Sequence, residues 1–213
     1  MDIVWHGLSC FRIVERGLAS VVTDPYGSKS GLRELKLRAD IITVSHDSPA
    51  HNYTKAVKGS RKIITGPGEY EIGGVFITGL PMRDKQAKEN GAKLNTLYVF
   101  DFNGITIAHL GDLSYVPSQA EIENLGAVDI ALVPVGGGSA LIPSQASEVI
   151  SLIEPSIIIP MQYNIDSTRG KLGSVTGFLK EMGITKLDAL PSLKINKSKL
   201  SEETQVVRLN PAG

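Results

Sequence analysis

Two short runs of consecutive apolar residues constrain the fold of this chain most. They read ALVP at residues 131–134 and IIIP at residues 157–160. Such runs cannot alternate between a buried face and a solvent face, so they belong in sheets that are covered by helices. Helical periodicity accompanies them at residues 118–125, 144–153 and 175–182. We therefore expect an α/β fold in which strands and helices alternate in the second half.

The first half of the chain is rich in predicted strands. Its apolar runs are separated by glycine, proline and polar turns and cover residues 3–5, 9–14, 19–23, 41–45, 62–65 and 75–78. Two later strands, 97–102 and 105–110, flank Asn103-Gly104, a pair that tolerates the positive φ of a tight hairpin turn. They should pair antiparallel. The charged interval 82–93 is expected to be a surface loop, with a lid over a pocket as the alternative.

Composition narrows the class of protein. With 42% hydrophobic residues in 213 positions, the chain can bury one large core, so one domain is expected over residues 1–213. Lys and Arg balance Asp and Glu at 22 each without a basic stripe, which disfavours a nucleic-acid partner.

The single cysteine, Cys10, cannot form an internal disulfide. No apolar stretch approaches about 18 residues, so we expect a cytoplasmic protein without a membrane span.

Polar residues follow several of the predicted strands. Asp24, His46, Asp112 and Gln162 each come shortly after an apolar run, as do the three glycines 136–138. Strand ends are where α/β folds build sites. The segment SHDSPAHN at 45–52 stands out because two histidines lie five residues apart, as in a metal-binding loop. The same residues also read as an ordinary helix start, with Ser48 as the cap and Pro49 in the first turn.

Seven segments together resemble the metallo-β-lactamase superfamily, in the branch of zinc hydrolases similar to L-ascorbate-6-phosphate lactonase. They are WHGLSCFRI at 5–13, TDP at 23–25, SHDSPAHN at 45–52, GPGEYEIGGV at 66–75, AHLGDL at 108–113, LVPVGGG at 132–138 and PMQY at 160–163. The resemblance spans nearly the whole chain. It implies a four-layer αββα sandwich of two mixed β-sheets with a metal pocket on one edge.

The ligand pattern of that family is incomplete in this chain. Its loop reads His-x-His-x-Asp-His, and here His46 and His51 are kept while Ser48 and Ala50 replace a histidine and the aspartate. A further histidine of the family falls near Arg83, and the last one is Gln162. Asp112, at the position that bridges the two metals in the family, is kept. Because a catalytic zinc generally takes three protein ligands, we expect no cofactor at full occupancy.

Two hypotheses about function follow from this count. The first is a non-catalytic homologue whose decayed metal pocket binds a small ligand, with phosphorylated compounds as one option, or serves an interaction role. The second is a hydrolase of lactones, esters or phosphoesters that uses one Zn or Mn ion on His46, His51 and Asp112. A third hypothesis, a structural module that forms homo-oligomers, is permitted by the apolar strands.

The predicted site residues are the same under the first two hypotheses. The pocket is expected to contain Asp24, His46, Ser48, His51, His109, Asp112 and Gln162. Asp47 and Asp112 are the candidate catalytic groups, because a histidine beside a carboxylate can act in general acid–base catalysis near neutral pH. A histidine placed like His109 is more often a hydrogen-bonded core residue. The three glycines at 136–138 could cradle a phosphate through backbone amides, but such a run is more often a plain turn.

Overall fold

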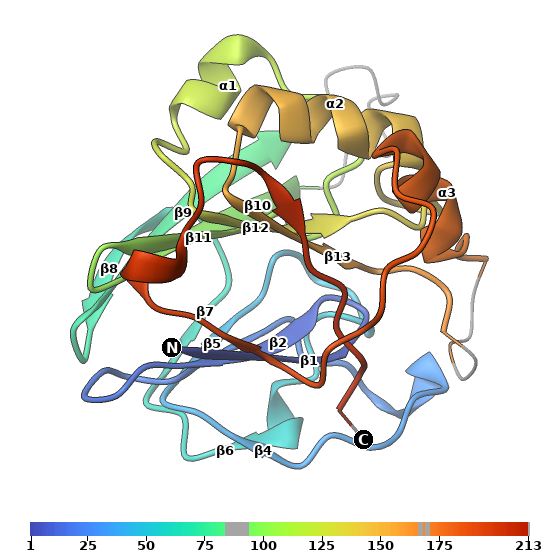
Figure 1. The fold of residues 1–213 in the computed structure, drawn as a ribbon. Coiled ribbons are helices and arrows are strands. Elements are labelled where there is room, and N and C mark those ends of the chain that lie inside the picture. The colour runs from blue at the N-terminus through green and yellow to red at the C-terminus, as the bar shows by residue number, and fades with distance from the viewer. Residues whose placement is uncertain (84–93, 166–167, 169–170, 213) are drawn as a thin grey trace.

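Two mixed β-sheets pack face to face in this computed structural model, which describes residues 1–83, 94–165, 168 and 171–212 (Figure 1). One sheet has six strands in the order β14-β1-β2-β3-β5-β7, and the other has seven in the order β15-β13-β12-β11-β10-β9-β8. Strands β4 and β6 form a separate pair. The bounds are β1 (Asp2–Gly7), β2 (Cys10–Val14), β3 (Val21–Thr23), β4 (Leu37–Arg38), β5 (Ile41–Thr43), β6 (Val57–Lys58), β7 (Lys62–Ile64), β8 (Gly68–Ile72), β9 (Val75–Arg83), β10 (Leu94–Phe102), β11 (Ile105–His109), β12 (Ile130–Pro134), β13 (Ile157–Met161), β14 (Leu193–Lys194) and β15 (Gln205–Val206).

Three α-helices lie on the outer face of the seven-stranded sheet, as Figure 1 shows. They are α1 (Gln119–Glu123), α2 (Pro143–Ile153) and α3 (Val175–Glu181). Beneath them, all five residues of β12 and all five of β13 are buried, and the two strands pair in parallel. This confirms the interpretation of the two continuous apolar runs, because a strand that is covered on both faces has no solvent side to supply with polar residues.

The predicted hairpin at Asn103-Gly104 is present. Strands β10 and β11 pair antiparallel, and the turn residues have φ of 55° and 80°. A second hairpin, between β8 and β9, turns at Gly73-Gly74, where φ is also positive at both residues. Strand β8 was not predicted, because its sequence GEYEI is half polar and lies at the edge of the sheet.

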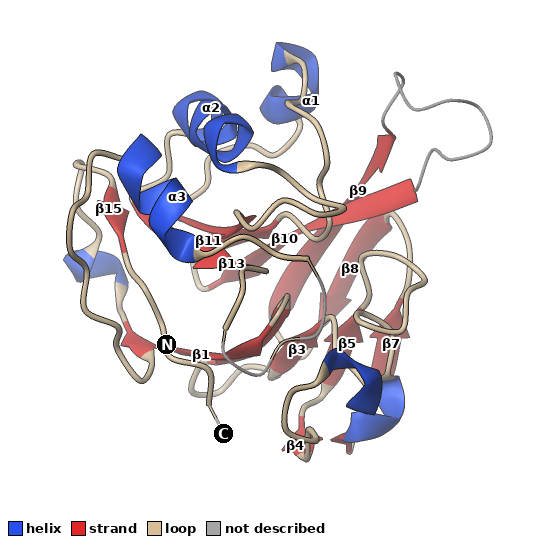
Figure 2. Ribbon diagram, turned by 90° about the vertical axis from the view of Figure 1, so that its right-hand side faces the viewer, coloured by secondary structure: helices blue, strands red, loops and turns tan. Residues whose placement is uncertain are grey.

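The outer face of the six-stranded sheet is covered by irregular structure. A separate apolar cluster lies there, made of Leu8, Cys10, Val22, Tyr26, Leu35, Ala39, Ile42, Val44, Ala56 and Val57. The β4-β6 pair and two 3-10 turns, η1 (Ser28–Ser30) and η2 (Thr54–Ala56), accompany it at the bottom of Figure 2. A third 3-10 turn is η3 (Lys197–Lys199). The layered α/β sandwich is thus confirmed, with its α-helices on one side.

The alternative reading of Ser48-Pro49 as a helix start is wrong. The amides of His51 and Asn52 both donate to the Ser48 carbonyl, which closes a single turn. The next amide, that of Tyr53, donates instead to the carbonyl of Pro25 at 2.7 Å, so the chain leaves the helical path. The first residues of the charged interval also differ from the prediction, because Met82 and Arg83 end β9 and pair with β10. The predicted lid falls on residues 84–93, which lie outside the described residues.

Several hydrogen bonds join the two sheets directly. The hydroxyl of Tyr98 on β10 donates to the carbonyl of Val44 at 3.0 Å, and the amide of Thr96 donates to the carbonyl of Ser45 at 2.8 Å. Both acceptors lie just past β5 in the other sheet. In the described residues, no helix is long and apolar enough to cross a membrane.

Candidate metal centre

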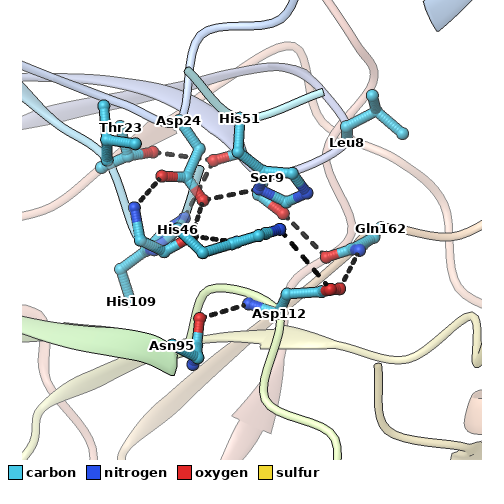
Figure 3. A network of polar contacts seen from close by, with 12 residues as sticks. Leu8, Ser9, Thr23, Asp24, His46, His51, Asn95, His109, Asp112 and Gln162 are labelled. Carbon is cyan, nitrogen blue, oxygen red and sulfur yellow. Dashed lines mark hydrogen bonds and ion pairs between the residues drawn. The ribbon is translucent and has the colours of Figure 1, made fainter. Parts of the chain in front are cut away.

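The predicted site residues lie at the ends of strands from both sheets. Asp24 follows β3 directly, and His46 comes shortly after β5, its parallel neighbour, with Thr23 in register with Thr43. Asp112 comes shortly after β11, and Gln162 directly follows β13. Because β3 and β5 run in parallel, their carboxyl ends meet at one edge. Figure 3 shows the side chains converging there.

Asp24 is a buried carboxylate that organises one side of the site. Its side chain accepts hydrogen bonds from the Ser45 amide at 2.7 Å, the Ser45 hydroxyl at 2.6 Å and His51 Nδ1 at 2.8 Å. Burial opposes ionisation of Asp24, but the hydrogen bonds from His51 and Ser45 and the favourable electrostatic interactions with His51 and His109 outweigh it and lower the pKa of Asp24. Asp24 is therefore ionised at neutral pH.

This carboxylate fixes the tautomer of His51. An ionised carboxylate can only accept hydrogen bonds, so His51 Nδ1 must carry the hydrogen that it donates to Asp24. In a neutral ring, Nε2 then keeps its lone pair. A carboxylate on one ring nitrogen is the usual support for a histidine that binds a metal through the other nitrogen.

His46 is oriented by the same network. Its Nδ1 lies 3.1 Å from the Ser45 hydroxyl, whose single hydrogen is used in the shorter bond to Asp24. The hydroxyl oxygen must therefore accept from His46 Nδ1–H. That leaves His46 Nε2 directed at Asp112 Oδ2, 3.7 Å away. A nitrogen lone pair and a carboxylate oxygen are both acceptors, so they repel each other at this distance unless a cation lies between them. That cation is either a proton on the ring or a metal ion shared by the two groups.

The loop that carries Asp112 is clamped by Asn95 of β10. The side chain of Asn95 donates to the Leu110 carbonyl at 3.0 Å and accepts from the Asp112 amide at 2.9 Å. Between those two residues, Gly111 has φ +59°, and a Cβ there would lie 2.4 Å from Asn95 Oδ1 and 2.6 Å from Ser45 Cβ. The close packing requires glycine at this position and fixes where the carboxylate emerges.

Gln162 contacts Asp112 through its amide nitrogen. The Gln162 Nε2 group donates to Asp112 Oδ1 at 2.6 Å, and the Ser9 hydroxyl donates to Gln162 Oε1 at 2.8 Å. The side-chain amide of Gln162 must have this orientation, because its oxygen facing an ionised carboxylate would put two acceptors against each other. The Ser139 hydroxyl donates to the same Asp112 oxygen at 2.9 Å.

His109 is fully buried behind the site. Its Nε2 bonds to the carbonyl of Ser9 at 2.9 Å, so this nitrogen carries the hydrogen. Burial lowers the pKa of His109, and the charge of Asp24 and the hydrogen bond to Ser9 oppose that shift only in part. His109 is therefore a neutral residue that ties β11 to the turn after β1. It is not among the residues that line the cavity.

An open cavity of about 360 Å³ lies in front of the histidines. Five of the predicted site residues line it: His46, Ser48, His51, Asp112 and Gln162. Asp24 lies behind the wall and acts through His51. Asp47 is exposed, bonds to the side chain of Asn52 and is not among the lining residues. Its proposed acid–base role, like that of Asp112, stays a prediction.

The sequence reasoning missed four polar residues of the cavity wall, Lys29, Ser30, Ser139 and Lys171. Ser139 directly follows the three glycines, and its position there was the one signal that could have pointed to it. Lys29 and Lys171 also line the cavity, from segments that are 142 positions apart in the chain. Nothing in their local sequence distinguishes them from other surface lysines.

Two of the retained ligands, His46 and Asp112, are spaced for one metal ion. Two ligands that each bind zinc at about 2.0–2.2 Å lie at most roughly 4.4 Å apart, and the 3.7 Å between His46 Nε2 and Asp112 Oδ2 satisfies this. The rings of His46 and His51 are 4.2 Å apart between centroids. As the side chains stand, no group of three or more His, Cys, Asp or Glu residues in the described ranges is arranged to hold an ion, so small side-chain rotations are needed.

Comparisons with known proteins show the family of this chain. Residues 2–162 match the family described as the beta-lactamase superfamily domain. A UPF0173 protein of Pyrococcus abyssi is 31% identical over 200 residues, covering 85% of this chain and 90% of that protein. A crystal structure of a Thermotoga maritima protein of the metallo-beta-lactamase superfamily shares 33% identity with a TM-score of 0.78, over 98% of this chain and 97% of that one.

The expectation that no cofactor is needed is contradicted by these relatives. A Thermoplasma acidophilum protein, 28% identical over 77% of this chain and 84% of its own length, is named a UPF0173 metal-dependent hydrolase. The expectation treated each replaced ligand as a loss from the whole centre, although His46, His51 and Asp112 are kept in the sequence. The narrower likeness to L-ascorbate-6-phosphate lactonase stays a prediction. The chain belongs to the metallo-beta-lactamase superfamily, among its UPF0173 proteins.

Proposed function

We propose that this protein is a metal-dependent hydrolase whose single metal ion is held by His46, His51 and Asp112. The observation that carries the proposal is the pair of oriented imidazoles, one fixed by Asp24 and the other by Ser45, beside a carboxylate oxygen 3.7 Å from His46 Nε2. The names of the relatives support the same activity. They give no support to the first hypothesis from sequence, a homologue without catalytic function.

The protein supplies the shape and polarity of the site. A bound divalent ion of the zinc type adds Lewis acidity toward a carbonyl or phosphoryl oxygen and toward water. Asp24 and Ser45 keep the two ring tautomers in which both Nε2 atoms have lone pairs, which spares the site a reorganisation cost when the ion binds. Zinc is favoured over magnesium because two of the three donors are imidazole nitrogens.

The substrate that we propose is a small anionic ester, lactone or phosphoester. Lys29 and Lys171 contribute two positive charges to the cavity wall, and Asp112 is the one carboxylate among its described lining residues. Neither lysine forms an ion pair with a described residue. A volume of about 360 Å³ lies at the low end of the range for small-molecule pockets. The cavity is therefore too small to enclose more than a compact molecule.

Metal content tests the proposal. The protein is purified from medium that contains zinc, manganese and iron, dialysed without chelator and measured by elemental analysis. We expect about one ion per chain in the wild type and loss of that ion in His51→Ala. His6→Ala is the matched control, because His6 is not a cavity-lining residue. A wild-type protein that retains no ion would contradict the proposal.

Activity supplies the second half of the test. Chromogenic carboxylic esters, lactones and phosphodiesters, each in an anionic and a neutral form, are assayed with metal-loaded protein and with Lys29→Ala and Lys171→Ala variants. We expect hydrolysis of at least one class, with the lysine variants raising KM for its anionic form and leaving the neutral form unchanged. Equal KM changes for both forms would refute the charge argument and leave the metal assignment standing.

A further inference from the structure

One oxygen of Asp112 is already saturated with hydrogen bonds. Asp112 Oδ1 accepts from Gln162 Nε2 at 2.6 Å and from the Ser139 hydroxyl at 2.9 Å. A carboxylate oxygen has two lone pairs, and these two donors use both of them. The other oxygen, Oδ2, faces His46. The two oxygens of this carboxylate therefore have different partners, and Figure 3 shows that both Gln162 and His46 contact Asp112.

Gln162 is held in place by more than its contact with Asp112. Its backbone amide donates to the carbonyl of Leu8 at 3.1 Å, and its side-chain oxygen accepts from the Ser9 hydroxyl. Its φ is +54°, a left-handed conformation that non-glycine residues rarely adopt. Leu8 itself has φ +48°. Such strain persists only where the surrounding contacts over-determine the conformation, so the donor group of Gln162 is firmly placed.

A metal ligand role for Gln162 is excluded by the same contacts. To present its oxygen to an ion beside Asp112, the amide would have to flip, which would set its oxygen against the carboxylate and its nitrogen against the Ser9 hydroxyl. The flip would exchange a charge-assisted hydrogen bond for a repulsive contact between two acceptors. Gln162 therefore serves Asp112 as a donor of hydrogen bonds.

We propose that Gln162 and Ser139 are positioning residues that occupy Asp112 Oδ1 and so restrict the centre to a single metal ion, bound through Asp112 Oδ2. The two donors neutralise the side of the carboxylate on which a second cation would have to bind. They also fix the carboxylate plane, so that Oδ2 stays directed at the histidines. This inference rests on the proposed function only in requiring that an ion binds.

A one-atom change gives the sharpest test. Gln162→Glu keeps the shape of the side chain but replaces the donor that faces Asp112 by an acceptor. Wild-type protein, Gln162→Glu and Ser139→Ala are prepared metal-free and titrated with zinc by calorimetry, and the bound ions are counted by elemental analysis. Ser151→Ala is the matched control, because Ser151 is exposed on α2, donates to the Ser147 carbonyl of its own helix and is not among the residues that line the cavity.

We expect one ion per chain in the wild type and in Ser151→Ala, with affinities within about threefold of each other. In Ser139→Ala the affinity should fall roughly 10- to 100-fold, the usual effect of removing a group that orients a ligand. In Gln162→Glu a second ion should bind, because two carboxylates then face each other. Thermal unfolding of the metal-free proteins checks folding, and exposed Ser139 should leave it unchanged.

The outcomes separate this inference from the proposed function. Two ions in the wild type would overturn the inference while the hydrolase proposal stands. No ion in the wild type would overturn both. One ion in the wild type, with Ser139→Ala and Gln162→Glu indistinguishable from Ser151→Ala in affinity and stoichiometry, would refute the positioning role and leave the single-ion site in place.

Discussion

Replacing Asp24 by Asn should damage stability and metal binding together. The carboxylate accepts three hydrogen bonds of 2.6–2.8 Å from Ser45 and His51 and has no solvent exposure. An amide can offer one oxygen only, and its NH₂ group must face at least one of these donors. Hydrogen bonds to a charged group contribute about 1.5–3 kcal/mol each, so losing one and burying an unpaired donor should cost about 2–4 kcal/mol of unfolding free energy.

The same substitution should weaken zinc binding. Without an ionised partner on Nδ1, His51 loses the preference for the tautomer whose Nε2 has a lone pair. Loss of such a partner typically lowers metal affinity roughly 10- to 100-fold. Denaturant titration of the metal-free protein measures the first effect, and calorimetric zinc titration at pH 7.5 measures the second.

Asp40→Asn provides a matched control on the surface. Asp40 also accepts from the amide and the hydroxyl of one serine, Ser20, at 2.9 and 2.8 Å, and its partner Arg61 is largely exposed. Its loss should cost less than about 1 kcal/mol, because surface ion pairs are worth little, and should leave zinc affinity unchanged. If Asp24→Asn and Asp40→Asn behaved alike in both assays, the reasoning about the buried network would be refuted.

Three further predictions concern the buried groups and the close-packed loops. Burial lowers the pKa values of His109 and His6, so the unfolded chain binds protons at these residues before the folded chain does as the pH falls below about 6.5. The unfolding free energy should therefore decrease from pH 7.5 to pH 5.5. A guanidinium unfolding midpoint that stays constant over this range would contradict the prediction. Gly136→Ala should lower the unfolding free energy by at least about 2 kcal/mol in denaturant titrations, because the new Cβ would lie 2.2 Å from the Gln162 carbonyl oxygen. Gly126→Ala, which has open space around the new Cβ, should lower it by about half as much. Cys10 is fully buried, and burial raises the pKa of its thiol, so Cys10 should react with a thiol reagent only after the protein unfolds. Rapid labelling of the native protein would contradict this, because it would mean that solvent reaches Cys10 on β2 in the folded state.

Local pattern was sufficient for most of the fold. The runs at 131–134 and 157–160 predicted β12 and β13, and Asn103-Gly104 predicted the turn between β10 and β11, because burial and turn conformation depend on neighbouring residues. The covering of the six-stranded sheet was less predictable. Its apolar cluster collects residues from separated turns that carry no periodic pattern.

The site was predictable in position but not in its contacts. Strand ends located His46, His51, Asp112 and Gln162 around one cavity. The role of Gln162, however, depends on Ser9, 153 positions away, whose hydroxyl fixes which end of the amide faces Asp112. Counting ligands by sequence position recorded Gln162 as a lost histidine, and only the geometry reveals it as a hydrogen-bond donor.

The geometry of the candidate site depends on the packing of the two sheets against each other. His46 and His51 come after β5 of the six-stranded sheet, and Asp112 comes after β11 of the seven-stranded sheet. Near these residues, the hydrogen bonds from Thr96 to Ser45 and from His109 to Ser9 connect the two sheets. A fluctuation that separates the two sheets would therefore separate the proposed ligands of the ion. Ion release during heating would therefore precede the loss of either β-sheet, and its temperature would report the first opening of the sandwich.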